Sequence, residues 1–371
     1  MSTQKGWNRR QFVHLMGYST LNSAGLCSSL LPSGTRSSVR FAYIASEHDE
    51  IHVYAVRGAE WTRVQTIASE RPVSLAVARN GRALYAVNEV SMHRGLPMGT
   101  VEAFTIGTDG RLTRLNRREL SLSATMPRHA AVSPDGKNLV VAVREGGAYN
   151  VLPIEEDASL GRVSSLLKET GIERAGVGSV AQPHSVVFDT AGRVIAADAG
   201  TGRVSVLGLN GDGLGIHGRL ESEDGVAVLR VAMHPSGRAL YAVREDGIAC
   251  YGYDPVAGKI DEMRQHTKVG CGGDAALAVH RSGEFVYASR REGGVAVWTA
   301  DRSTGRLSAA GVDGETTGKL RAMEMAPEGN SLIAVSSNGR VMESFIDAAS
   351  GRLSAAALRA RVESPLCVAL V

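Results

Sequence analysis

The sequence is poor in residues and patterns that mark several large classes of protein. It has 4 Cys, an aromatic fraction of 5%, and 41 basic against 38 acidic residues, for a net charge of +3. A charge this close to balance argues against a general nucleic-acid or polyanion binder, which carries a basic excess or stripe. No uncharged apolar run of about 18 residues follows the N-terminal segment, so we expect no transmembrane helix in the body of the chain.

The four cysteines are too scattered for a structural metal site. Cys27, Cys250, Cys271 and Cys367 form neither a C-x-x-C pair nor a Cys/His cluster at zinc spacing. Cys250 and Cys271 could pair in an oxidising compartment. The alternative is that they are small buried hydrophobic residues.

Glycine, by contrast, is abundant. The 371 residues include 43 Gly, 43% are hydrophobic and 21% are charged. The glycines indicate many tight turns between short apolar segments, and the charged fraction argues against global disorder. The length fits one large domain or two.

The N-terminal segment is typical of an export signal. Lys5, Arg9 and Arg10 form a basic start, and residues 12–31 contain no Asp, Glu, Lys or Arg. The run NRRQFVH at 8–14 resembles the bacterial twin-arginine motif. The alternative is a disordered basic tail.

This segment sets the expected domain boundaries and location. We expect a signal at 1–35 and one folded domain at 36–371, in a periplasmic or secreted protein, or a cytoplasmic protein if the signal is not used. Cys27 follows Leu26 rather than a small residue, so a lipoprotein anchor does not fit and no stable membrane anchor is expected.

One unit recurs six times along the body. Each copy has an apolar strand, a turn with glycine, a second apolar strand, a gap and a third strand. The turn glycines, spaced by 55, 56, 45, 46 and 46 residues, are Gly81, Gly136, Gly192, Gly237, Gly283 and Gly329. A period in the forties with several short strands is typical of a β-propeller, and no copy shows helical periodicity.

The two ends of the body supply a seventh unit. Residues 40–46, 50–56 and 62–68 are expected as strands two to four of a blade, and 364–371 as its first strand. We therefore predict an all-β, seven-bladed β-propeller whose last blade is closed by the N- and C-terminal strands, which removes the last open sheet edge. The alternative is a shorter ring with a separate terminal strand pair.

Charged residues fall where the innermost strands should ring one mouth of the central channel. Strands one and two are antiparallel around the glycine turn, so residues eight before and eight after the glycine should lie side by side. The set before is Val73, Arg128, His184, Leu229, Ala275 and Arg321, and the set after is Glu89, Arg144, Gly200, Glu245, Arg291 and Ser337. Arginines with a histidine and glutamates suit an anionic, oxygen-rich ligand. The alternative is an ordinary solvated rim.

The motifs around these positions resemble the seven-bladed lactonase propellers, which include one type of bacterial 6-phosphogluconolactonase and the fungal carboxymuconate lactonizing enzymes. The resemblance covers nearly all of residues 41–371. Its motifs are LYAVNEV (84–90) with GTVEAF (99–104), PRHAAVSPDGK (127–137), QPHSVVF (182–188) with DAGTGRV (198–204), and SPLCVAL (364–370).

The resemblance implies a catalytic set at the channel mouth. The histidine of its PHS motif matches His184, the glutamate that ends the next blade's second strand matches Glu245, and the arginine of a later SNR motif matches Arg291. The family's arginine in a GPRH motif falls on Leu229, with Arg230 beside it. Either Arg230 turns inward, or arginines of other blades supply the missing charge.

The function expected from this set is hydrolysis of sugar lactones, as in 6-phosphogluconolactonase. His184 or Glu245 would accept a proton from water, and Arg291 would stabilise the oxyanion. The candidates for binding a small anionic or sugar lactone are Arg128, Arg144, Arg230, Arg321, His129 and Glu89. An exported protein would meet unphosphorylated lactones.

Two other functions stay open, and no cofactor is expected. One alternative is a non-catalytic anion-binding or scaffold propeller, and the other is a muconate-type cycloisomerase. The arginine-rich ring would repel a metal cation. The sequence has neither a glycine-rich phosphate loop nor a G-x-S-x-G elbow, so nucleotide cofactors and a serine nucleophile lack support.

Overall fold

The computed structural model describes residues 40–174, 177–211, 213–222, 224–270, 275–313 and 318–371. The regular structure of these residues is entirely β, and none of it is a helix long and apolar enough to cross a membrane. The predicted signal segment and Cys271 lie outside the described residues.

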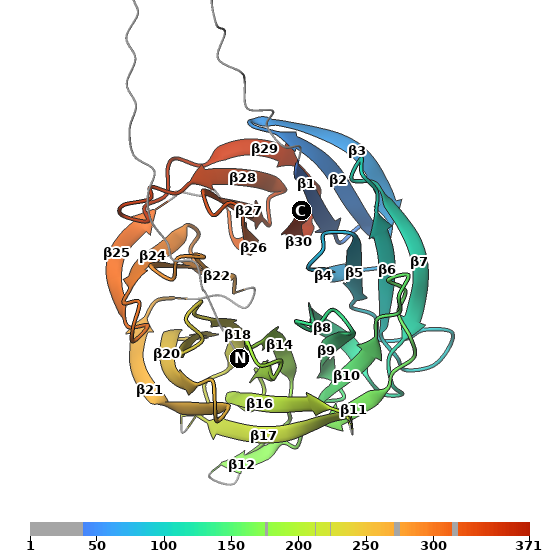
Figure 1. The fold of residues 1–371 in the computed structure, drawn as a ribbon, viewed down its shortest axis with the longest axis vertical. Helices are drawn as coiled ribbons and strands as arrows, with labels where there is room; N and C mark the ends of the chain where they lie inside the picture. Colours follow the sequence, from blue (N-terminus) through green and yellow to red (C-terminus); the bar gives the residue numbers. More distant parts are fainter. Residues whose placement is uncertain (1–39, 175–176, 212, 223, 271–274, 314–317) are drawn as a thin grey trace, which may run out of the picture. The chain divides into compact units, whose positions relative to one another are not determined.

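The described strands form seven four-stranded antiparallel sheets, arranged as blades of a ring, and one two-stranded hairpin (Figure 1). The blade that joins the two ends of the body has the strand order β3-β2-β1-β30. Its strands are β1 (Arg40–Ser46), β2 (Glu50–Arg57), β3 (Glu60–Ala68) and β30 (Pro365–Leu370).

Each of the other six blades consists of four consecutive strands. Going round the ring, they are β4 (Pro72–Val77), β5 (Ala83–Asn88), β6 (Thr100–Ile106) and β7 (Leu112–Glu119); β8 (Thr125–Val132), β9 (Asn138–Glu145), β10 (Ala148–Pro153) and β11 (Ser165–Lys168); β14 (Pro183–Phe188), β15 (Val194–Asp198), β16 (Arg203–Asn210) and β17 (Gly213–Glu221); β18 (Val228–Met233), β19 (Ala239–Arg244), β20 (Gly247–Asp254) and β21 (Lys259–Lys268); β22 (Leu277–Val279), β23 (Phe285–Ser289), β24 (Val295–Ala300) and β25 (Leu307–Asp313); and β26 (Leu320–Met325), β27 (Ser331–Ser336), β28 (Arg340–Phe345) and β29 (Ala357–Arg361).

The ring is closed by pairing of the first and last described strands. β1 runs antiparallel to β30, from Ala42 opposite Leu370 to Ser46 opposite Pro365. One residue past β30, the backbone N–H groups of Val371 and of Phe41 in β1 donate to each other's carbonyls, at 2.9 and 2.8 Å. The predicted seventh blade is therefore confirmed, and the shorter ring is wrong.

The glycine turns have the predicted backbone conformation. All six turn glycines have φ between 66° and 84°, in the left-handed region that glycine adopts without steric cost. The two longer spacings come from insertions that the repeat does not predict. A connection with a His93–Leu96 bridge joins β5 to β6, and the hairpin of β12 (Ile172–Arg174) and β13 (Val177–Ser179) precedes β14.

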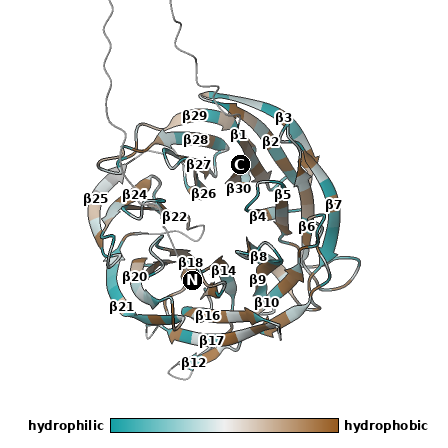
Figure 2. Cartoon of the chain, in the orientation of Figure 1, coloured by the Kyte–Doolittle hydropathy of each residue, from teal (hydrophilic) through white to brown (hydrophobic). Residues whose placement is uncertain are grey.

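The core lies between the blades. Each buried apolar cluster takes residues from two neighbouring blades, and the outer strands β7 and β21 are mostly hydrophilic (Figure 2). Buried tyrosine hydroxyls also join neighbouring blades, because they donate to carbonyls in the turn between the last two strands of the next blade. Tyr241 donates to Gly305 at 2.8 Å, and Tyr287 donates to Gly351 at 2.9 Å.

Candidate active site

The first strands of the blades surround the axis of the ring, and a repeated irregularity points side chains into the space between them. The pairing of the first strand shifts register at the same place in six blades, and the residues skipped are Val73, Arg128, His184, Leu229, Arg321 and Leu366. A β-bulge of this kind leaves one residue outside the ladder and re-aims its side chain. Of the predicted set before the turn glycine, all but Leu229 line the channel mouth.

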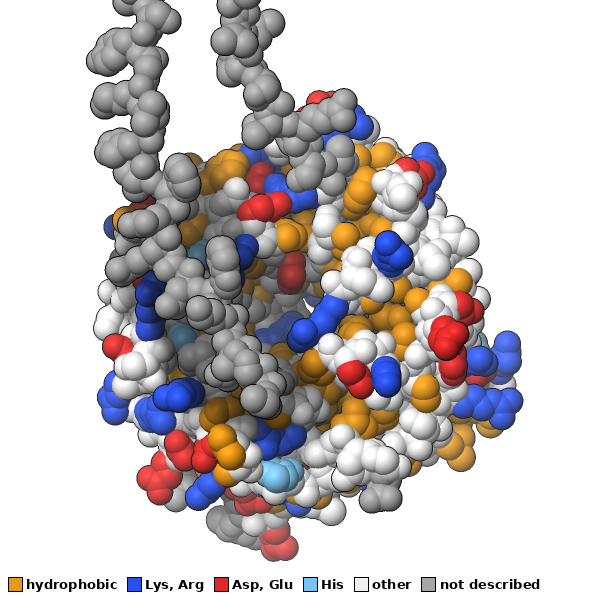
Figure 3. Space-filling view, viewed as in Figure 1, with side chains coloured by type: hydrophobic (Ala, Val, Ile, Leu, Met, Phe, Trp, Pro, Cys, Tyr) orange, Lys and Arg blue, Asp and Glu red, His pale blue; other side chains and the backbone are white. Residues whose placement is uncertain are grey.

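Two cavities that share wall residues occupy this central space. The first, of about 50 Å³, is lined by Val73, Arg128, His184, Arg230, Ala275, Arg321, Ala322, Leu366 and Cys367. The second, of about 220 Å³, shares five of these residues and continues along the strands toward their glycine turns, as far as His129, Val187, Ala232 and Glu324. In the space-filling view the ring is hollowed at its centre, and basic side chains lie in and around the opening (Figure 3).

His184 is held in one defined state. Its Nδ1 lies 2.6 Å from the carbonyl oxygen of Leu229. A carbonyl only accepts, so Nδ1 carries the hydrogen and Nε2 carries the lone pair of the neutral ring. Burial lowers the His184 pKa to about 3, helped by Arg128 and Arg230 and opposed by the bond to Leu229. The ring is therefore uncharged at neutral pH.

His129 has the opposite tautomer. Its Nδ1 accepts the backbone N–H of Val186 at 3.3 Å, so the hydrogen of the neutral ring is on Nε2. Burial, followed by the charges of Arg230, His184 and Arg128, holds the His129 pKa well below its ordinary value. The site thus combines a hydrogen-bond acceptor, His184 Nε2, with a hydrogen-bond donor, His129 Nε2–H.

Arg128 and Arg144 are both ion-paired to Glu89. Arg128 lies 3.1 Å and Arg144 3.7 Å from the Glu89 carboxylate, which also lies 3.4 Å from Arg71. Glu89 is only 6% exposed, so it serves as a counterion beneath these arginines. Arg144 also lowers the His184 pKa, which places both arginines in the electrostatic surroundings of that ring.

Arg230 turns into the channel, which agrees with the first of the two predicted alternatives. It lines both cavities and donates through Nε to the Ala275 carbonyl at 3.3 Å. Leu229 is buried in an apolar cluster between blades. Across the mouth, Arg321 lies 3.4 Å from Glu47.

Glu245 and Arg291 lie apart from this cavity. Both side chains are exposed, and neither belongs to the walls of the two central cavities. Their backbone N–H groups donate to the carbonyls of Ala227 and Gly270 at 3.2 and 2.6 Å. Glu245 is the first residue after β19 and Arg291 the second after β23. Both lie outside the paired ladder, so their positions do not impose an inward direction. Their catalytic roles stay predictions, and their positions in the structure do not support them.

Two titratable residues of the central walls, Glu324 and Cys367, are not among the predicted site residues. Glu324 is five residues before its turn glycine, and the other five copies have only Ala or Val at that position. This single charged exception is the signal that could have identified it. Among the described residues, no group of three or more His, Cys, Asp or Glu is placed to hold a metal ion.

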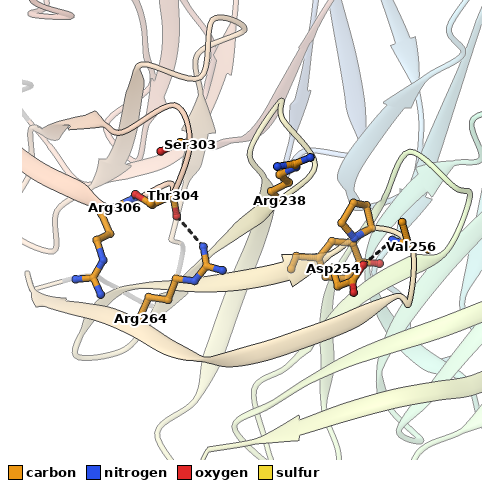
Figure 4. A pocket seen from close by; sticks show the side chains of 9 residues that line it. Arg238, Asp254, Val256, Arg264, Ser303, Thr304 and Arg306 are labelled. Carbon is orange, nitrogen blue, oxygen red and sulfur yellow. Dashed lines mark hydrogen bonds between the residues drawn. The ribbon is translucent and has the colours of Figure 1, made fainter.

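A further cavity of about 640 Å³, the outer cavity, lies away from the bulges, between the β20–β21 turn and the β24–β25 turn of the next blade (Figure 4). Three arginines line it, and one of them, Arg264, donates to the Thr304 carbonyl at 3.0 Å. The carboxylate of Asp254 accepts the backbone N–H groups of Val256 and Ala257, which lower its pKa. This surface can attract an anion, but its carboxylate is a weak base.

Comparisons with known proteins agree with this architecture. Residues 37–370 match the family model described as lactonase, 7-bladed beta-propeller. A 6-phosphogluconolactonase of Bacillus subtilis (strain 168) is 24% identical over 247 residues, covering 64% of this chain and 69% of that protein.

Solved structures share the fold. A Bacteroides uniformis protein superposes with a TM-score of 0.80 at 18% identity, covering 90% of this chain and 99% of that one. The periplasmic gluconolactonase of Pseudomonas aeruginosa gives a TM-score of 0.77 at 21% identity, with the same coverage of 90% and 99%.

Proposed function

The chain belongs to the seven-bladed β-propeller lactonase family, and we propose that it hydrolyses the ring ester of a sugar lactone at the mouth of its central channel. Membership of the family supports lactone hydrolysis, and the substrate and the residues are proposed from the site. The observation that carries the proposal is the His184 ring. Its bond to Leu229 leaves Nε2 as a proton acceptor in a cavity lined by arginines.

In the proposed reaction, His184 moves one proton. Its Nε2 accepts a proton from water as the water oxygen bonds to the ring carbonyl carbon. The carbonyl electrons move to oxygen, and the guanidinium groups of Arg128 and Arg230 stabilise the resulting charge. When the tetrahedral intermediate collapses, the ring C–O bond breaks and the imidazolium returns its proton to the leaving oxygen. The product is a hydroxy acid.

The arginines also govern the strength of this base. With the mouth empty, their charges help to hold the His184 pKa at about 3, which makes Nε2 a weak acceptor. A negative charge that develops between Arg128 and Arg230 offsets their repulsion of the imidazolium and raises that pKa. The ring therefore becomes a stronger base as the oxyanion forms.

We further propose an unphosphorylated sugar lactone as substrate and a periplasmic location. The twin-arginine-like segment supports export, and one relative by fold is described as a periplasmic gluconolactonase. The B. subtilis relative is described as a 6-phosphogluconolactonase, so the phosphorylated lactone is the substrate to compare.

The second candidate is a propeller that binds anions without catalysis. Two observations favour it: Glu245 and Arg291 are exposed outside the cavity, and Leu229 replaces the family's arginine. Arginines at the mouth would still attract a carboxylate or phosphate.

Acid release from both lactones by the purified chain tests the proposal. Because these lactones hydrolyse spontaneously, the wild type is compared with His184→Ala and with the matched control His48→Ala, whose side chain is 52% exposed. We expect the wild type and the control to exceed buffer, and His184→Ala to lose about 10²- to 10⁴-fold in kcat, the usual contribution of a general base. A wild type no faster than His184→Ala or buffer would leave the anion-binding propeller as the function.

A further inference from the structure

Below the mouth, the larger central cavity contains an acidic side chain that the smaller cavity lacks. At the register five residues before the turn glycine, five blades carry Ala or Val, and only the blade of β26 carries an acid, Glu324. Because the neighbouring side chains are small, the Glu324 side chain has room in the channel and remains exposed there. One acidic group is thus set into an otherwise apolar layer.

Polar groups on three other strands line the same cavity. Arg128 and His129 come from β8, Arg230 from β18 and Cys367 from β30. Solvent reaches Glu324 through the channel, but the surrounding walls remove part of the hydration of its carboxylate and raise its pKa to about 7, with Arg230 opposing this shift. Burial raises the pKa of the Cys367 thiol to about 12, so that group stays neutral.

These groups match hydroxyls better than they match a metal cation. The His129 Nε2–H and the Arg230 guanidinium donate, whereas the Glu324 carboxyl accepts when ionised and both donates and accepts when protonated. A hydroxyl can pair with every one of them, because it donates and accepts. A metal cation would meet Arg230, and the described residues hold no metal-binding group of three.

We propose that this cavity, the lower chamber, binds the hydroxyl-bearing carbons of a polyhydroxy acid or its lactone, and that Glu324 determines the selectivity for hydroxyls. The orientation, with the ester carbon at the mouth beside His184, rests on the proposed function. The preference for hydroxyls does not, because it follows from the walls of the chamber. Glu324 is therefore a specificity-determining residue and takes no part in the proton transfer.

Calorimetric titration with two carboxylates tests this selectivity. Gluconate and hexanoate have the same chain length and carboxylate, and only gluconate has hydroxyls on the chain. We expect the wild type to bind gluconate at least about tenfold more tightly, since a hydrogen bond to a charged group contributes a factor of this size. Equal affinity for the two ligands would overturn the proposal, and this comparison needs no variant.

Substitutions then assign the preference to Glu324. Glu324→Ala introduces the residue that most blades carry at this register and should reduce the preference about fivefold or more, with hexanoate binding unchanged. Glu324→Gln keeps a hydrogen-bonding group and should retain part of the preference. Glu60→Ala, on the exposed start of β3, is the matched control. A full preference in Glu324→Ala would refute the assignment.

Kinetics separate this inference from the proposed function. If the wild type hydrolyses gluconolactone, Glu324→Ala should raise KM and keep kcat within about twofold, because only uniform binding is lost. A large fall in kcat with unchanged KM would contradict a selectivity role. If the wild type hydrolyses no lactone but still prefers gluconate, the proposed function fails and the lower chamber stands.

Discussion

Acidification is expected to destabilise the fold through His184. The folded-state pKa of about 3 lies below the ordinary histidine value of 6.5. Between these values the unfolded chain binds the proton and the folded chain does not. The free energy of unfolding therefore falls as pH drops below 6.5, and the full loss of about 5 kcal/mol is reached below about pH 3. Between about pH 7.5 and pH 5 the same linkage removes about 2 kcal/mol.

Urea unfolding at these two pH values measures the effect, with Trp298 as a buried fluorescent probe that is 2% exposed. His184→Gln removes the titrating group, so the stability difference between wild type and variant should change by about 2 kcal/mol between the two pH values. The exposed residue His48, changed to Gln, should give a pH dependence parallel to the wild type within about 0.5 kcal/mol.

Parallel pH dependences for the wild type and His184→Gln would contradict a lowered pKa of His184 in the folded state. They would mean that the folded protein accepts a proton on His184 as readily as the unfolded chain does. The ring would then not be held neutral by burial and by Arg128 and Arg230. Nε2 would then not be kept available as a proton acceptor at the mouth by these charges.

Three further outcomes follow from the contacts described. Tyr241→Phe should lower the free energy of unfolding by about 1 kcal/mol in urea, because it removes a buried bond to the next blade. Gly110→Ala and Gly136→Ala both place alanine at positive φ, which should lower the free energy of unfolding by roughly 1 kcal/mol. Gly110→Ala should lower it by well over that amount in the same assay, because only there would the new Cβ collide with an aromatic ring. Equal losses for the two variants would contradict this. Arg230→Ala should weaken gluconate binding about tenfold by calorimetry, because Arg230 lines the central cavities. Arg238 lines only the outer cavity near Asp254, so Arg238→Ala should leave gluconate binding unchanged.

The ring could be predicted from the sequence because its signals are local and repeated. The glycine turns recur at nearly constant spacing, and the apolar strands on either side of them match the buried strands of the structure. The closing blade followed from the unpaired strand patterns near Arg40 and Pro365. The β12–β13 hairpin interrupts the repeat and has no periodic counterpart, so only the longer spacing at Gly192 hinted at an insertion.

The site could be predicted only in part, because side-chain direction depends on more than distance along a strand. Counting from the turn located Arg128 and His184 because a bulge re-aims both toward the channel. The same count grouped them with Glu245 and Arg291, which follow a strand and are exposed. Glu324 lies five residues from its turn glycine, so a count of eight residues does not reach it.

The bulges separate the chemistry of the mouth from the architecture of the ring. A residue that stands outside the ladder contributes little to strand register, so its replacement alters the cavity wall without disturbing its neighbours' pairing. The six skipped positions already hold a valine, two leucines, two arginines and a histidine on the same scaffold. Five of these six positions line the cavity at the mouth, so new ligand preferences can arise there by single substitutions while the fold stays constant.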